Sequence, residues 1–93
     1  MANEVKASHI LVKDEAQCNE LKAKIANGAS FEDVARDNST CPSGKKGGDL
    51  GYFGRGQMVK EFETAAFDAN TNEVVGPVKT QFGYHLIKVT ESR

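Results

Sequence analysis

The residues of this chain that could carry chemistry begin with its only two histidines, His9 and His85. Each falls inside an apolar run that favours a strand, and imidazole is the side chain best suited to proton transfer near neutral pH. If the two were buried side by side they would share a hydrogen bond, because two buried imidazolium ions would repel each other. From spacing alone, a pair of core histidines is the favoured interpretation.

Cys41 is the candidate nucleophile. A thiol enzyme needs a base beside the sulfur and an electropositive setting that favours the thiolate. Either histidine can supply the base, but no acid is identifiable as a third member. The other cysteine, Cys18, falls on the apolar face of an expected helix, where a free thiol behaves as a small hydrophobe. Both are expected to be free thiols in a reducing compartment, which indicates the cytoplasm.

A glycine-rich stretch, CPSGKKGGDLGYFGRGQM, runs from Cys41 to Met58 and holds six of the nine glycines. It lacks the G-x-x-x-x-G-K-[ST] and G-x-G-x-x-G spacings of phosphate-binding loops. No histidine or cysteine spacing matches a zinc site, so neither a metal nor a cofactor is expected. Met58 and Phe62 have i, i+4 spacing and, with Phe53, are candidates for an apolar binding site. Ordinary core packing explains the same spacing.

Hydrophobic periodicity predicts the elements that must position these residues. Strands are expected over 5–12, 51–53, 74–80 and 84–90, and helices over about 15–27, 31–38 and 58–67. Asp14 with Gln17, and Ser30 with Asp33, have the spacing of a capping box at the start of the first two helices. Pro77 is typical of an edge strand.

This order of elements predicts an α+β domain in which an antiparallel sheet packs against helices. Alternation along the first strand puts Val5, Ala7 and His9 on one face. In the last strand it puts His85 with Ile87 and Val89. If these two strands pair at the centre of the sheet, the histidines become neighbours on one face.

The length of 93 residues predicts one domain spanning residues 1–93, expected to be monomeric. No apolar run is long enough to cross a bilayer, and the N-terminus lacks the apolar core of a secretory signal. The formal net charge of −1 gives no basic excess, so specific nucleic-acid binding is not expected. Lys45, Lys46 and Arg55 are the only residues that would support it.

Three motifs taken together resemble the parvulin-type peptidyl-prolyl cis/trans isomerases. They are H-I-L in the first strand, G-G-D-L-G-x-F-x-x-G-Q-M from Gly47 to Met58, and G-P-V-x-T-x-x-G-Y-H from Gly76 to His85. The resemblance runs from about Lys6 to Glu91. It implies a four-stranded antiparallel sheet surrounded by helices, in the order strand, helix, helix, short helix, strand, helix, strand, strand. It also implies an isomerase that acts on Xaa-Pro bonds in peptides and in unfolded or flexible protein segments.

The resemblance assigns roles to individual residues. The implied catalytic residues are His9, Cys41, Thr80 and His85; the implied proline pocket is Leu50, Phe53, Met58 and Phe62; and possible contacts at its rim are Lys45, Lys46 and Gln57.

Phosphorylation-specific relatives carry a long basic loop after the first strand. Here that link is Lys13-Asp14-Glu15, so no phosphorylation requirement is expected. Lys45 and Lys46 would instead favour an acidic residue before the proline. Two alternatives stay open: a non-catalytic peptide-binding or chaperone module on the same scaffold, and a thiol enzyme built on Cys41.

Overall fold

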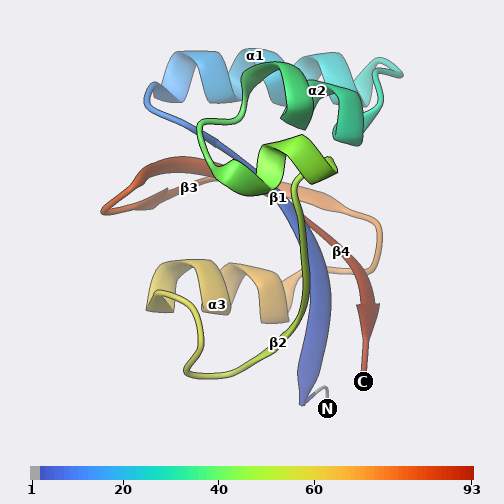
Figure 1. Cartoon of the computed structure of the whole chain (residues 1–93), viewed down its shortest axis with the longest axis vertical. Coiled ribbons are helices and arrows are strands. Elements are labelled where there is room, and N and C mark those ends of the chain that lie inside the picture. Colours follow the sequence, from blue (N-terminus) through green and yellow to red (C-terminus); the bar gives the residue numbers. More distant parts are fainter. Residues whose placement is uncertain (1–2) are drawn as a thin grey trace.

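The computed structural model describes residues 3–93, which form one antiparallel sheet with helices on both of its faces (Figure 1). The elements in chain order are β1 (Glu4–Val12), α1 (Glu15–Ala26), α2 (Phe31–Asn38), the short 3-10 helix η1 (Pro42–Lys46), β2 (Asp49–Gly54), α3 (Lys60–Asp68), β3 (Val74–Thr80) and β4 (Gly83–Ser92). The strand order is β2-β1-β4-β3. The expected fold class is confirmed, including the short helix in the glycine-rich stretch.

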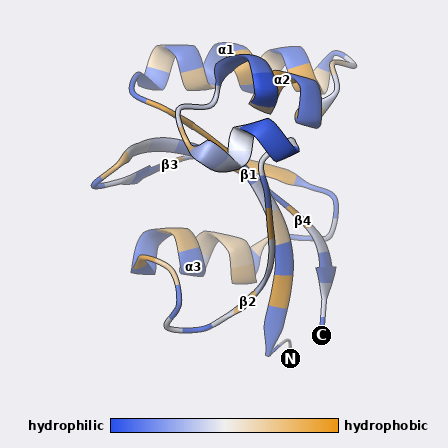
Figure 2. Cartoon of the chain, in the orientation of Figure 1, coloured by the Kyte–Doolittle hydropathy of each residue, from blue (hydrophilic) through white to orange (hydrophobic). Residues whose placement is uncertain are grey.

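Hydrophobic and hydrophilic residues are interspersed along β1 (Figure 2), and successive side chains in a strand point to opposite faces, so the apolar side chains of β1 are divided between two clusters. One cluster packs Ile10, Val12 and Leu86 against α1 and α2. The other packs Val5 and Ile87 against α3, on the opposite face of the sheet. The expected division is therefore confirmed, and the sheet separates two cores.

The helix starts confirm one capping prediction and contradict another. The Ser30 hydroxyl accepts a hydrogen bond from the Asp33 backbone N–H at 3.3 Å, as a helix cap should. Asp14 makes no such bond at the start of α1, so the prediction of a capping box there is wrong. The helix expected from residue 58 begins only at Lys60, so Met58 lies in the segment that leads into α3.

The central and edge strands of the sheet are those that the sequence predicted. β1 and β4 are the central pair, and β3, which carries Pro77, is an edge strand. Proline has no N–H to donate to a ladder, and an edge strand tolerates its absence. Within residues 3–93, no helix combines the length and the apolar character needed to cross a bilayer.

Candidate active site

The two histidines meet on the α3 face of the central strand pair. His9 lies on β1 and His85 on β4, where His85 pairs with Leu11 and His9 with Ile87. This register puts the two Nδ1 atoms 3.0 Å apart, with the rings stacked at 5.2 Å between centroids. Only 5% of His9 and 4% of His85 is exposed. The prediction that the histidines are neighbours is confirmed.

The histidine pair is the middle of a chain of hydrogen bonds. At one end, Thr80 Oγ1 lies 2.8 Å from His85 Nε2 and accepts from the backbone N–H of Phe82 at 3.1 Å. At the other end, His9 Nε2 lies 3.1 Å from Ser43 Oγ, and the Ser43 hydroxyl donates to Cys41 Sγ at 3.3 Å. All four imidazole nitrogens therefore have a partner.

One arrangement of protons satisfies every bond in this chain when both imidazoles are neutral. Because Ser43 gives its hydrogen to Cys41, its oxygen accepts from His9 Nε2–H. His9 Nδ1 is then an acceptor and takes the Nδ1–H of His85, whose Nε2 accepts from Thr80. These tautomers are assigned from the network of partners. Every hydrogen bond in this chain is therefore donated in the same direction, from Thr80 towards Cys41.

The pKa values support neutral imidazoles. Burial, and to a smaller extent repulsion by a charged His85, lower the pKa of His9 to about 4. Burial also lowers the pKa of His85. At neutral pH both imidazoles are therefore uncharged, and each ring donates one hydrogen bond and accepts one.

A cavity of about 510 Å³ opens above the histidine pair. Phe62, on α3, presents its ring edge-on to both imidazoles, with centroids 5.4 Å from His9 and 5.2 Å from His85. Met58 lines the cavity from the segment before α3, so the two reach one site without sharing a helix. The full lining is His9, Leu11, Thr40, Cys41, Pro42, Leu50, Gln57, Met58, Val59, Phe62, Phe82 and His85.

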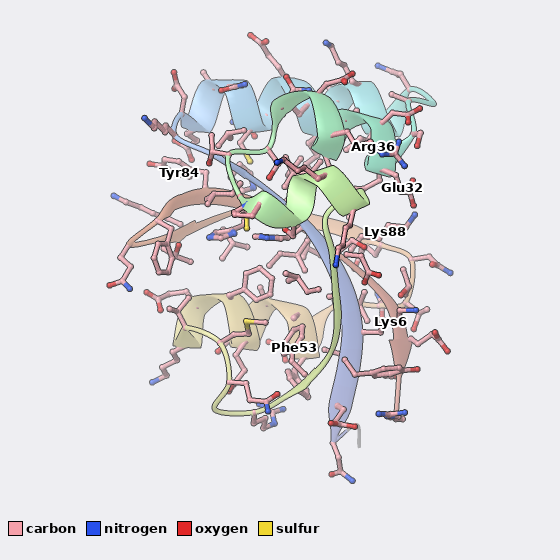
Figure 3. The ribbon with its side chains drawn as sticks, in the orientation of Figure 1. Lys6, Glu32, Arg36, Phe53, Tyr84 and Lys88 are labelled. Atoms are coloured by element: carbon pink, nitrogen blue, oxygen red, sulfur yellow. The ribbon has the colours of Figure 1, made fainter. Side chains whose placement is uncertain are left out.

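Three of the expected contacts do not reach this cavity. Phe53 is 2% exposed and lies in the interior between β2 and α3 (Figure 3), where its ring packs 5.9 Å from that of Phe62. It supports the pocket wall from behind. Lys45 and Lys46 are exposed on η1 and line no part of the cavity; Lys46 instead lines a separate hollow with Lys6 and Glu91. The expectation that Lys45 and Lys46 contact the substrate at the rim of this cavity is therefore corrected.

Ser43 and Phe82 are the main site residues that the sequence reasoning missed. Ser43 looks like an ordinary loop serine, two positions after Cys41, and only the turn of η1 brings its hydroxyl to His9. Phe82 sits in the connection between β3 and β4, and its one sequence signal is a large apolar side chain in a tight turn.

The glycine-rich stretch reaches the histidines because Gly48 lacks a side chain. Its φ of +86° belongs to the left-handed region, and a Cβ there would collide with the His9 carbonyl oxygen. This close approach lets the His9 backbone N–H donate to the Gly48 carbonyl at 2.9 Å. The stretch is therefore a wall of the site, held against β1.

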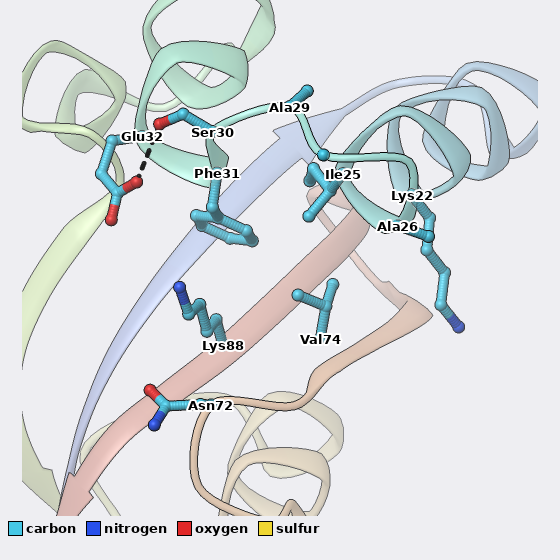
Figure 4. A pocket seen from close by; sticks show the side chains of 11 residues that line it. Lys22, Ile25, Ala26, Ala29, Ser30, Phe31, Glu32, Asn72, Val74 and Lys88 are labelled. Atoms are coloured by element: carbon cyan, nitrogen blue, oxygen red, sulfur yellow. Dashed lines mark hydrogen bonds between the residues drawn. The ribbon is translucent and has the colours of Figure 1, made fainter.

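A second and larger cavity, of about 610 Å³, lies on the α1 and α2 side of the sheet (Figure 4). Phe31 and Val74 line its apolar part, with Lys88 beside the Phe31 ring. Several of its polar groups already have partners: Lys22 donates to the Gly76 carbonyl at 2.7 Å, and Ser30 donates to Glu32 at 3.0 Å. The histidines and Cys41 lie elsewhere, so the smaller cavity is the candidate active site.

Comparison with known proteins decides the family. Residues 1–93 match the PPIC-type PPIase domain over the whole chain. The chain belongs to the parvulin-type peptidyl-prolyl cis/trans isomerases. The expected family, a family of peptidyl-prolyl isomerases, is confirmed, and the cavity above the histidine pair remains the candidate active site.

Relatives of this parvulin domain include longer proteins and a small one. It is 57% identical to foldase protein PrsA 1 of Bacillus cereus, covering 95% of this chain and 31% of that protein. PrsA from Bacillus anthracis superposes with a TM-score of 0.97 at 48% identity, covering 99% of this chain and 43% of that one. NmPin, the parvulin of Nitrosopumilus maritimus, superposes at 0.89 with 42% identity, covering 98% and 99%. The chain spans about a third of the length of the curated relatives it matches.

Within residues 3–93 of this parvulin domain, no group of three histidine, cysteine, aspartate or glutamate side chains is placed to hold a metal ion.

Proposed function

We propose that this parvulin domain isomerises Xaa-Pro bonds of flexible protein segments without forming a covalent intermediate. The observation that carries the proposal is the uncharged apolar cavity placed directly over a neutral, fully hydrogen-bonded histidine pair. Met58, Phe62 and Leu50 hold the prolyl ring. Cys41 and the two histidines lie beside the rotating amide, and Thr80, which does not line the cavity, acts through its hydrogen bond to His85.

Rotation about an Xaa-Pro bond is slow because the amide must lose its resonance, at a barrier of roughly 18–20 kcal/mol. The planar amide separates more charge than the twisted one, so an apolar cavity disfavours the planar form more. Binding that favours the twisted form accelerates rotation, and removing roughly 6 kcal/mol of the barrier would give about 10⁴-fold. No proton or nucleophile need be consumed.

The bonding of Cys41 supports a role without covalent chemistry. Its Sγ accepts a hydrogen bond from the Ser43 hydroxyl, while His9 Nε2 is hydrogen-bonded to Ser43 and not to the thiol. The imidazole base that a thiol enzyme needs is thus engaged elsewhere. Cys41 ends the hydrogen-bond chain and, as a cavity-lining group, presents its sulfur to the substrate.

Substitution of Cys41 should distinguish a hydrogen-bond acceptor from a covalent nucleophile at this position. Cys41→Asp keeps an acceptor for the Ser43 hydroxyl, so it should lower kcat/KM by less than about threefold; Cys41→Ala removes that acceptor and should lower it by roughly 2- to 10-fold, the worth of one hydrogen bond. The measurement is proline-limited refolding of a substrate protein with each variant. An inactive Cys41→Asp variant that is folded by circular dichroism would instead indicate thiol chemistry.

A phosphoserine before the proline should bring no advantage. Among the lining residues of the cavity there is no lysine or arginine, and both histidines are neutral, so a dianion would lose its hydration without gaining a partner. We expect kcat/KM for phosphoserine-proline peptides to be equal to or below that for the unphosphorylated peptides. NMR exchange spectroscopy on the matched pair measures this, and a large preference for phosphoserine would contradict it.

The rival on this scaffold is a module that binds peptides without turning them over. The complete network between Thr80 and Cys41 favours catalysis. A binder would shift the peptide resonances on titration but leave the cis/trans exchange rate unchanged. Exchange cross-peaks that grow with catalytic amounts of protein support the isomerase, and their absence supports the binder.

We also propose that the domain acts as a monomer in a reducing compartment such as the cytoplasm, without specific nucleic-acid partners. Both cysteines are free thiols, and burial raises the pKa of Cys18 to about 11, which keeps it a neutral core group. The net charge of −1 gives little attraction to phosphates. Sedimentation at two concentrations tests the oligomeric state, and fractionation of the source cells tests the location.

A further inference from the structure

The mouth of the cavity carries an exposed aromatic ring that the mechanism above does not use. Phe82 lies between β3 and β4, lines the cavity and is 60% exposed. Among residues 3–93 it is the one large hydrophobic side chain left so exposed. An exposed apolar group at a binding cavity is stabilised when a ligand covers it, so its position points to a contact with substrate.

The size of the cavity leaves room for such a contact. A single five-membered ring fills only a small part of about 510 Å³, a volume within the range of pockets that hold much larger ligands. Leu11 and Pro42 line the same cavity, and Leu11 approaches the turn that carries Phe82 at Gly83. Phe82 therefore belongs to an apolar surface that is contributed neither by α3, which carries Phe62, nor by the segment before α3, which carries Met58.

The chemistry of the lining limits what this surface can accept. Of the lining residues, none is aspartate, glutamate, lysine or arginine, and the two histidines are held neutral by their shared network. A charged side chain beside the proline would lose its hydration here without a partner. An aromatic or large aliphatic side chain would pack on the Phe82 ring.

The backbone of Phe82 is hydrogen-bonded to the histidine network. Its backbone N–H donates to Thr80 Oγ1 at 3.1 Å, and the same hydroxyl bonds to His85. The main-chain position from which the Phe82 side chain extends is thus tied to the histidines, so a substrate side chain that packs on Phe82 lies near the reacting amide, and the contact can act on the transition state as well as on binding.

We propose that Phe82 is a specificity-determining residue, which selects segments with an aromatic or large aliphatic side chain adjacent to the proline. The inference rests on the proposed isomerase function and names the substrate class of that same site. It replaces the expected preference for an acidic residue, because Lys45 and Lys46 do not line the cavity.

Two series of short peptides test the proposal, with Phe, Leu, Ala or Glu placed before the proline in one and after it in the other. NMR exchange spectroscopy gives kcat/KM for each. In at least one series the wild-type protein should favour Phe over Ala by about 3- to 10-fold, the range of one aromatic contact, and Glu should be the poorest. Phe82→Ser should reduce the Phe-to-Ala ratio to near one.

Two further variants serve as controls. Phe82→Leu keeps an apolar surface and should retain part of the ratio, whereas Gln81→Ala, in the same turn but outside the cavity lining, should keep all of it. A wild-type ratio near one in both series, or a ratio that Phe82→Ser leaves unchanged, overturns the proposal. A wild-type protein that accelerates none of the peptides overturns the isomerase function itself, which is visible before any variant is made.

Discussion

Truncation of Phe62 to alanine should lower kcat/KM by roughly 100-fold, the largest loss expected from a single side chain of this site. The ring closes one side of the cavity and stands edge-on to both imidazoles. Its loss removes apolar contact worth about 2–3 kcal/mol with the prolyl ring and lets water reach the amide. Met58→Ala should lose about tenfold, because Met58 is only partly buried and lies outside the helix.

The assay for this prediction is proline-limited refolding, corrected for the fraction of folded protein. The correction matters because Phe62 is 3% exposed, and its truncation should also lower the free energy of unfolding by about 3–5 kcal/mol. Phe67→Ala is the matched control, since Phe67 packs in the same cluster and contacts Phe53 but does not line the cavity. It should lose stability and keep its activity per folded molecule. Equal activity losses in the Phe62 and Phe67 variants would contradict the assignment of Phe62 to the proline pocket.

Acidification should destabilise the fold well before its carboxylates are protonated. The pKa of His9 is about 4 in the folded protein, against an ordinary value of 6.5, so the unfolded chain binds more protons between these values. The free energy of unfolding therefore falls as pH falls through this window. The expected loss is about 3 kcal/mol between pH 7 and pH 4, of which about 2 kcal/mol is lost by pH 5. His85 acts in the same direction, since burial lowers its pKa as well.

Urea unfolding at half-unit steps between pH 7 and pH 5 measures this slope. The pKa of Glu32 is lowered below its ordinary value by hydrogen bonds from a backbone N–H and from the Ser30 hydroxyl, so this carboxylate contributes little in that range. The control is His9→Asn, which removes the titrating ring and should flatten the slope even if its overall stability is lower. A wild-type stability that stays constant from pH 7 to pH 5 would mean that the histidines titrate normally and are not held neutral.

Local pattern was enough to predict where the histidines point. Alternation along β1 and β4 is a property of a few neighbouring residues, and it fixes which side chains share a face once the strands form. The same holds for the Ser30 cap, whose partner is three residues away. The cap expected at Asp14 has the same spacing and does not form, since its backbone enters the helix without a side-chain bond. Local signals thus predict which bonds are possible but leave open which of them form.

Such local patterns do not predict which aromatic ring lines the cavity and which is buried behind it. Phe53 and Phe62 are both apolar residues of the implied pocket, yet Phe62 lines the cavity and Phe53 lies behind it. Which ring faces the ligand depends on how β2, β1 and α3 stack, and these elements are brought together by tertiary packing. Lys45 and Lys46 show the same limit, since they lie on η1 beside the site and yet do not line the cavity.

The sequence by itself determined the family, the α+β order of elements and the presence of two histidines on one face of the sheet. Its motifs and its strand periodicity involve residues that are close in the sequence, which is why they can be recognised without a tertiary structure. Only the tertiary structure decided that His9 and His85, 76 positions apart, share a hydrogen bond, and that Ser43 connects this pair to Cys41. Those bonds depend on the register of β1 against β4 and on the close approach that Gly48 allows, and both are set by the packing of the whole chain.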